Sequence, residues 1–259
     1  MSVVAGGRRL SGIFPLGGQS ASERVEMAGG YDVTLLGREP CGSDICTMRF
    51  ERPEGYVFSP GQWFRLTLPT AQGPLAETFS HCSAPSDPYL ELTTRLGASP
   101  FKRALAALEP GAAAHIVGPG GRLHIADDIE RVAFLVGGVG ATPVRSILRD
   151  AKARGRRFAD ALLLYGNRDV SCVPFLGEFE QMDDIGVRTV VVYERPPAGW
   201  DGETGFITSE TVRRYVDVDD GRLFVVTGPP VMVAVMESVL DQLRIPAGQR
   251  LIERFGEGV

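Results

Sequence analysis

The feature of this chain that most constrains its fold is an apolar segment that runs directly into a glycine-rich turn. Residues Arg131–Val136 are apolar after the first position, and the turn 137–143 that follows has the sequence Gly-Gly-Val-Gly-Ala-Thr-Pro. Such a continuous apolar segment is typical of a strand buried on both faces of a parallel sheet. A helix should follow, with Thr142 as its N-cap, Pro143 as its first residue and Gly155 just beyond its end.

The rest of the C-terminal half alternates strands and helices in the same way. Further buried strands are predicted at Ala161–Tyr165, Val187–Tyr193 and Leu223–Val226, and the segment after Pro230 carries its apolar residues on one helical stripe. This alternation favours a parallel, doubly wound sheet with right-handed crossovers. Residues 129–259 are therefore predicted to form an α/β domain.

Residues 31–125 follow another pattern, with a period of two and frequent turn signals. Trp63–Leu68 and Tyr89–Thr94 read as short strands, and turns such as Ser-Pro-Gly at 59–61 separate the runs. Short strands at this spacing indicate a small antiparallel barrel, interrupted by one helix at Pro100–Leu108. Residues 1–30 lack the apolar core of a signal peptide and are interpreted as a flexible leader.

Composition narrows the class of protein. The 259 residues are 44% hydrophobic and 23% charged, as expected of a globular protein with a substantial core. The net charge of −5 argues against a broadly basic surface for nucleic acid. No apolar run approaches the roughly 20 residues of a membrane-spanning helix. The four cysteines form no C-x-x-C pair, so we expect no metal site. Cys41 and Cys46 could form a disulfide, but we expect reduced thiols in a cytoplasmic protein.

The turn at 137–143 carries the strongest functional signal. Glycines let backbone N–H groups approach a pyrophosphate, and a helix N-terminus favours its negative charge. The segment Thr-Gly-Pro-Pro at 227–230 repeats the arrangement after a later strand, so the two turns should flank one crevice. The alternative is a tight strand–helix turn without a ligand. The nucleotide-binding candidates are Gly138, Gly140, Thr142, Pro143, Gly228 and Pro229.

Four motifs occur in a particular order: Glu-Thr-Phe-Ser at 77–80, the glycine turn at 137–143, Thr-Gly-Pro-Pro at 227–230 and Glu-Arg-Phe at 253–255. In this order the chain resembles the ferredoxin–NADP reductase-like family of FAD/NAD(P) oxidoreductases from about Tyr31 to Phe255. The resemblance implies an N-terminal antiparallel six-stranded β-barrel that binds FAD, followed by the doubly wound α/β domain for NAD or NADP.

The resemblance implies roles for the first motif and the strand that continues it. Phe79 would pack on the isoalloxazine ring, Ser80 would reach toward flavin N5, and the backbone of His81, Cys82 and Ser83 would meet the flavin edge. In the family an arginine holds the FAD diphosphate at the position of Glu77, and a carboxylate there would repel phosphate. The alternative is an ordinary strand with Phe79 in the core.

A second flavin segment lies at 93–102. It resembles a Gly-x-Ser turn that opens a helix, where N–H groups would hold phosphate and Arg95 or Lys102 could supply the missing positive charge. The alternative for these two bases is a solvated surface. The candidates in this segment are Thr94, Arg95, Gly97, Ser99 and Lys102.

The remaining candidates concern the nicotinamide nucleotide. Thr227, at a position where the family often has cysteine, and Phe255, in the C-terminal motif, are expected beside the nicotinamide. Near Asn167 and Arg168, an acid such as Asp169 would bind the ribose of NAD and an arginine would accept the 2′-phosphate of NADP. The residues alone leave this choice open.

These observations predict a flavoprotein reductase. Hydride would pass from NAD(P)H to FAD near Ser80, and the flavin would pass electrons to an external acceptor, whether a ferredoxin-like protein, an oxygenase component or a small molecule. Two alternatives remain, both kept open by Glu77. One is a flavin reductase that holds flavin loosely, and the other is a non-catalytic nucleotide-sensing or electron-transfer subunit of the same fold.

Overall fold

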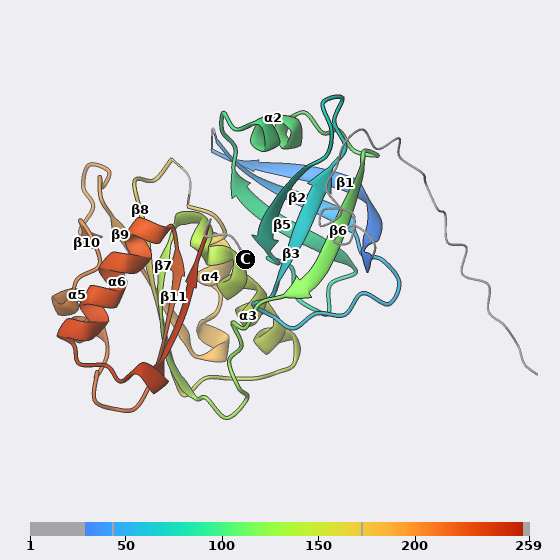
Figure 1. Ribbon diagram of the computed structural model, residues 1–259. Helices are drawn as coiled ribbons and strands as arrows, with labels where there is room; N and C mark the ends of the chain where they lie inside the picture. The colour runs from blue at the N-terminus through green and yellow to red at the C-terminus, as the bar shows by residue number, and fades with distance from the viewer. Residues whose placement is uncertain (1–28, 43, 172, 256–259) are drawn as a thin grey trace, which may run out of the picture.

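The computed structural model describes residues 29–42, 44–171 and 173–255, so most of the proposed leader and Cys172 lie outside the described residues. Two six-stranded sheets lie side by side, with helix α3 between them (Figure 1). The elements of the first half are β1 (Tyr31–Cys41), β2 (Ile45–Glu51), β3 (Trp63–Leu68), β4 (Leu75–Ser80), β5 (Tyr89–Arg95), α2 (Pro100–Ala106) and β6 (Ala113–Gly120).

The first sheet is antiparallel, with the order β4-β3-β6-β1-β2-β5. Its two edges meet, because the N–H of Cys82, just after β4, donates to the carbonyl of Glu91 in β5 at 2.9 Å. The apolar residues that alternate along these strands share one buried core, which includes Phe50, Phe64 and Leu92. The expected antiparallel barrel of six strands is confirmed.

The second half contains β7 (Arg131–Gly137), η2 (Gly138–Gly140), α3 (Ala141–Ala153), β8 (Asp160–Asn167), α4 (Leu176–Phe179), η3 (Asp183–Ile185), β9 (Val187–Tyr193), β10 (Glu203–Thr204), α5 (Ser209–Tyr215), β11 (Leu223–Gly228), α6 (Pro230–Gln242), η4 (Ala247–Gln249) and β12 (Arg250–Arg254). All five strand pairs of this sheet are parallel, in the order β10-β9-β8-β7-β11-β12.

Strand β7 explains why the C-terminal half reads as continuously apolar. Phe134 and Val136 face the core that α3 covers, whereas Ala133 and Leu135 face the core that α5 and α6 cover. The strand order runs from β7 to β8 in one direction and from β7 to β11 in the other. Ligands of open α/β sheets bind at such a reversal, and the two glycine turns follow these two strands. The doubly wound parallel sheet is thus confirmed.

The start of α3 differs from the prediction. The helix begins at Ala141 after the turn η2, so Thr142 and Pro143 lie inside its first turn. The Thr142 hydroxyl donates to the carbonyl of Val139 at 3.0 Å instead of capping an N–H group. The predicted cap was two residues too late, because the backbone is already helical at Gly140, with φ −58 and ψ −14. Within the described residues, no helix is both long and apolar enough to cross a membrane.

Candidate functional site

The two glycine turns pack directly against each other at the reversal of strand order. The buried Thr227 hydroxyl donates to the carbonyl of Gly140 at 2.7 Å. A Cβ on Gly140 would come within 2.4 Å of the Thr227 carbonyl oxygen, so only glycine allows this approach. Thr227 therefore joins the turns from within, and its hydroxyl points away from the surface where a nicotinamide would lie.

The outer surface of the first turn is open. Gly138 has φ +50, and a Cβ there would meet no heavy atom within 4 Å. The phenol of Tyr165 holds the Gly138 carbonyl at 3.0 Å, which fixes the turn from behind. Helix α6 begins after the exposed Pro229 without a side-chain cap, so the N–H groups that follow Pro230 are available to an anion. At the start of α3 the N–H of Ala141 is already bonded to the carbonyls of Gly138 and Val139.

The barrel and the α/β sheet meet through Ser80 and Glu253. Ser80, the last residue of β4, donates its hydroxyl proton to the Glu253 carboxylate at 3.0 Å. Glu253 lies in β12 opposite Thr227, so this contact is adjacent to the paired turns. Burial raises the pKa of the Glu253 carboxyl above its usual range, although the Ser80 hydrogen bond lowers it. Phe255 follows, half-buried, with its N–H on the Gly228 carbonyl at 3.1 Å.

Glu77 does not lack a positive partner. The Lys102 ammonium lies 2.7 Å from the Glu77 carboxylate, donates to the Thr94 hydroxyl at 2.8 Å and sits 4.4 Å from the centre of the Phe79 ring. Burial lowers the pKa of Lys102, and the hydrogen bond that its ammonium donates to Glu77 opposes that shift. Phe79 is buried in the barrel core beside Phe101, with ring centres 5.7 Å apart. Its ring is thus covered by Lys102 and α2.

The other residues of the second segment lie around the start of α2. Ser99 is the N-cap, and its hydroxyl accepts the Lys102 N–H at 3.1 Å. Gly97 lies in the preceding loop with open space at its Cα. The Arg95 guanidinium pairs with Asp44 on the surface. Of the two bases considered, Lys102 therefore lies at the Glu77 position and Arg95 points elsewhere.

His81, Cys82 and Ser83 are fully buried, and several of their polar groups are bonded within the protein. The N–H of His81 donates to Gln62, and its ring stacks on Phe58 with centres 3.8 Å apart. The carbonyls of Cys82 and Ser83 accept hydrogen bonds from α3. Cys82 and Ser83 thus connect the barrel to α3, and Ser80 ends the strand beside Glu253.

The loop after β8 contains the candidates for nucleotide choice. Asp169 pairs with Arg195 at 3.1 Å and also accepts from the Ser171 N–H, so its charge is already compensated. Arg168 is exposed, and Asn167 is half-buried with its amide on the Tyr165 carbonyl. An exposed arginine and a paired acid lie together, and both nucleotides remain compatible with this loop.

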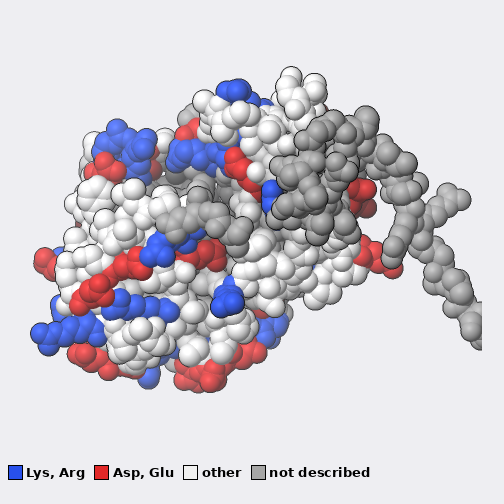
Figure 2. Space-filling view, in the orientation of Figure 1, with Lys and Arg blue, Asp and Glu red and all other residues white. Residues whose placement is uncertain are grey.

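Four residues of the site region were not identified as site residues from the sequence. Glu253 lies in the Glu-Arg-Phe motif, and its place in this C-terminal motif was the available signal. Tyr165, Arg145 and Glu91 gave no such signal, because their partners are far away in the chain. On the face in Figure 2, basic and acidic side chains are interspersed, so the net charge is not gathered into one patch there.

Comparisons with known proteins agree with this arrangement. A family model described as "Oxidoreductase NAD-binding domain" matches residues 134–238. The ferredoxin–NADP reductase B of Sorangium cellulosum is 28% identical over 239 residues, which are 87% of this chain and 97% of that protein. The NADH-cytochrome b5 reductase 1 of Ajellomyces capsulatus is 27% identical over 149 residues, 54% of this chain and 48% of that protein.

A solved structure shares the complete fold. The ferredoxin NADP+ reductase from Neisseria gonorrhoeae, with bound FAD and NADP, superimposes with a TM-score of 0.77. The alignment covers 88% of this chain and 99% of that chain, at 23% sequence identity. At this identity the likeness speaks for the fold, with both sheets in the same arrangement.

Proposed function

Because the chain belongs to the ferredoxin–NADP reductase-like family of FAD/NAD(P)-binding oxidoreductases, we propose that its crevice between Ser80 and the paired glycine turns is the place of electron transfer. The protein is an NAD(P)H-dependent flavoprotein reductase, and its electrons pass on to an external acceptor. The observation that carries the placement is the Ser80–Glu253 contact, which brings the end of a barrel strand to the switch point of the α/β sheet.

The residues fit the two cofactors unequally. For NAD or NADP, the open face of Gly138 and the uncapped start of α6 form a cradle that suits a pyrophosphate. For FAD, the barrel offers Ser80, Thr94 and the start of α2. The Lys102 ammonium is the base available to the diphosphate, and the Glu77 carboxylate competes for it at 2.7 Å. FAD is therefore proposed to bind with a weakened diphosphate contact.

FAD, when bound, accepts a hydride equivalent from NAD(P)H and releases the electrons singly to the acceptor. The Ser80 hydroxyl is held in one orientation by Glu253, and its oxygen would adjoin the reactive edge of a flavin bound there. Phe255 lies on the Gly228 carbonyl beside that position, where its half-buried ring can exclude water. Thr227 keeps the two turns at a fixed separation.

An acceptor protein or an oxygenase component would have to approach the region between Ser80 and the glycine turns, and we propose that this electron transfer takes place in the cytoplasm.

The proposed function is tested by measuring reduction of an artificial one-electron acceptor by NADH or NADPH, with and without added FAD. FAD-dependent turnover supports a reductase. The absence of turnover at saturating FAD with either nucleotide would argue for the non-catalytic alternative.

A further inference from the structure

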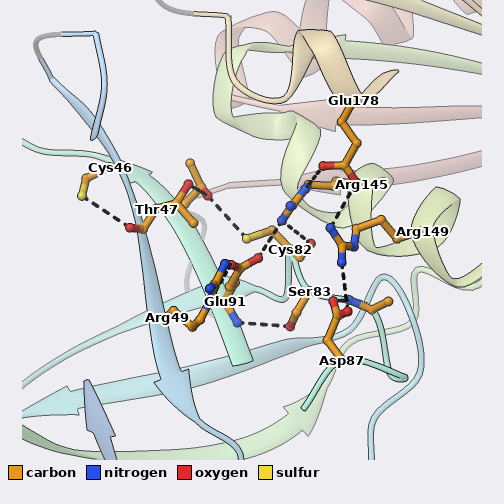
Figure 3. A network of polar contacts seen from close by, with 12 residues as sticks. Cys46, Thr47, Arg49, Cys82, Ser83, Asp87, Glu91, Arg145, Arg149 and Glu178 are labelled. Atoms are coloured by element: carbon orange, nitrogen blue, oxygen red, sulfur yellow. Dashed lines mark hydrogen bonds and ion pairs between the residues drawn. The ribbon is translucent and has the colours of Figure 1, made fainter. Parts of the chain in front are cut away.

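The contact between the barrel and α3 contains an ionic cluster of three arginines and three carboxylates. We call these residues the α3 cluster: Arg49, Asp87, Glu91, Arg145, Arg149 and Glu178. Figure 3 shows Arg145 and Arg149 pointing from α3 toward the barrel, where Glu91 and Asp87 face them. The charges balance three against three, so the cluster carries no net charge.

Arg145 is the central member and is well buried, with its side chain 10% exposed. One terminal nitrogen donates to the Glu91 carboxylate at 2.7 Å and to the Cys82 carbonyl at 3.0 Å. Its Nε donates to Glu178 at 2.7 Å, and its guanidinium lies 4.4 Å from the centre of the Phe175 ring. Each partner lies in a fixed direction, as the planar guanidinium requires.

These contacts connect the two parts of the proposed site over a short length of chain. Arg145 lies in the first turns of α3, immediately after the turn η2 that would bind the nucleotide. Cys82 lies two residues after Ser80. The next residue of α3 repeats the link, because the Ser146 hydroxyl donates to the Ser83 carbonyl at 2.7 Å.

Buried ion pairs are weak evidence for stability, because the loss of hydration offsets their attraction. Their geometry, however, is strict, and hydride transfer is sensitive to misplacement of the reacting atoms by about 1 Å. Building on the proposed function, we propose that Arg145 is a positioning residue that sets the separation between the nucleotide turn and Ser80. A variant that cannot make the contacts of the Arg145 guanidinium should then slow electron transfer more than it weakens cofactor binding.

The first test is the substitution Arg145→Lys, which keeps the charge but cannot bond in three fixed directions. Arg149→Met is the matched control, because Arg149 lies one turn later, is 25% exposed and contacts Asp87 and Glu178 but neither Cys82 nor Glu91. Rapid mixing with NAD(P)H should show a limiting rate of flavin reduction about 10- to 100-fold lower in Arg145→Lys. The apparent Kd for the nucleotide and the FAD content should change far less, and Arg149→Met should react like the wild type.

A second readout needs no cofactor. Amide hydrogen exchange of the ligand-free protein should become faster at 80–91 and 138–146 in Arg145→Lys, and stay unchanged there in Arg149→Met.

The double variant Arg145→Met/Glu91→Leu removes both charges of the buried pair, so it distinguishes a positioning role from a role in stability. It should unfold at a temperature close to that of the wild type and still react slowly.

The proposal is overturned if Arg145→Lys has a wild-type limiting rate and wild-type exchange, or if Arg149→Met loses as much rate as Arg145→Lys. It is also overturned if the double variant regains the wild-type rate. Failure of wild-type flavin to be reduced by either nucleotide would instead overturn the proposed function. In that case the exchange comparison still decides whether Arg145 joins the two segments.

Discussion

The hydroxyl of Ser80 and the carboxylate of Glu253 are 3.0 Å apart, although 173 positions separate them in the chain. One residue ends a barrel strand and the other lies in the edge strand of the parallel sheet. This contact joins the barrel to the α/β sheet at the point where we propose that flavin and nicotinamide meet.

The first prediction concerns this pair. Ser80→Ala removes the hydroxyl and leaves the Glu253 carboxylate buried without its donor, so NAD(P)H should reduce the flavin at least about tenfold more slowly. Glu253→Gln keeps an acceptor for Ser80 and should retain more of the rate. The limiting rate in single-turnover mixing measures both. Equal rates in Ser80→Ala and the wild type would show that the hydroxyl has only a structural role.

The second prediction concerns the FAD diphosphate. Glu77→Gln removes the carboxylate that competes for Lys102, so FAD affinity should rise, by about tenfold if the freed ammonium makes a charge-assisted contact. Lys102→Met should weaken FAD binding, whereas Arg95→Met, which breaks a surface pair with Asp44, should leave it unchanged. Fluorescence titration with FAD measures the three affinities. If Glu77→Gln binds FAD no better, Lys102 does not contact the diphosphate.

The third prediction concerns the nucleotide turn. Gly140 is a poor probe because any side chain there would collide with Thr227, but Gly138 faces open space with a positive φ that Asn and Asp tolerate. Gly138→Asp should weaken NAD(P)H binding about tenfold relative to Gly138→Asn, since the two differ only in charge near the pyrophosphate. Nucleotide titration of both variants checks this. Equal affinities would place the pyrophosphate elsewhere.

The fourth prediction concerns stability and pH. Burial lowers the pKa of His81 from 6.5 to about 3, so the unfolded chain binds a proton below pH 6.5 that the folded chain rejects. Stability is therefore lost as pH falls through this window, with a slope that approaches about 1.4 kcal/mol per pH unit. His81→Asn should remove this slope between about pH 5 and 6.5, above the range of ordinary carboxyl titration. Urea unfolding at several pH values measures it, and an unchanged slope in the variant would assign the effect to other groups.

Much of the fold could be predicted because local pattern and global structure agree. Val187–Tyr193 and Trp63–Leu68 were predicted with the boundaries that the structure has, since alternation and turn residues define them. Strand β12 gave only a weak signal, because its five residues are all half-buried. The short helices α4 and α5 were not predicted; α4 has only four residues and so gives little periodicity.

The site was harder to predict, because its contacts join residues that are distant in the chain. Lys102 was recognised as a base near Glu77, but its contact with the Phe79 ring follows from the packing of α2 on β4. The Thr227 hydroxyl was expected toward the nicotinamide, and the close approach of Gly140 turns it inward. Arg145 resembles any helix arginine until the barrel is placed against it.

The most direct test of the central claim is anaerobic mixing of the FAD-loaded protein with NADH and, separately, with NADPH. The account predicts that at least one nucleotide bleaches the absorption of oxidised flavin, and that deuterium at nicotinamide C4 slows the bleaching. It is contradicted if the protein binds FAD and dithionite bleaches it while neither nucleotide does, or if no FAD is bound at any concentration.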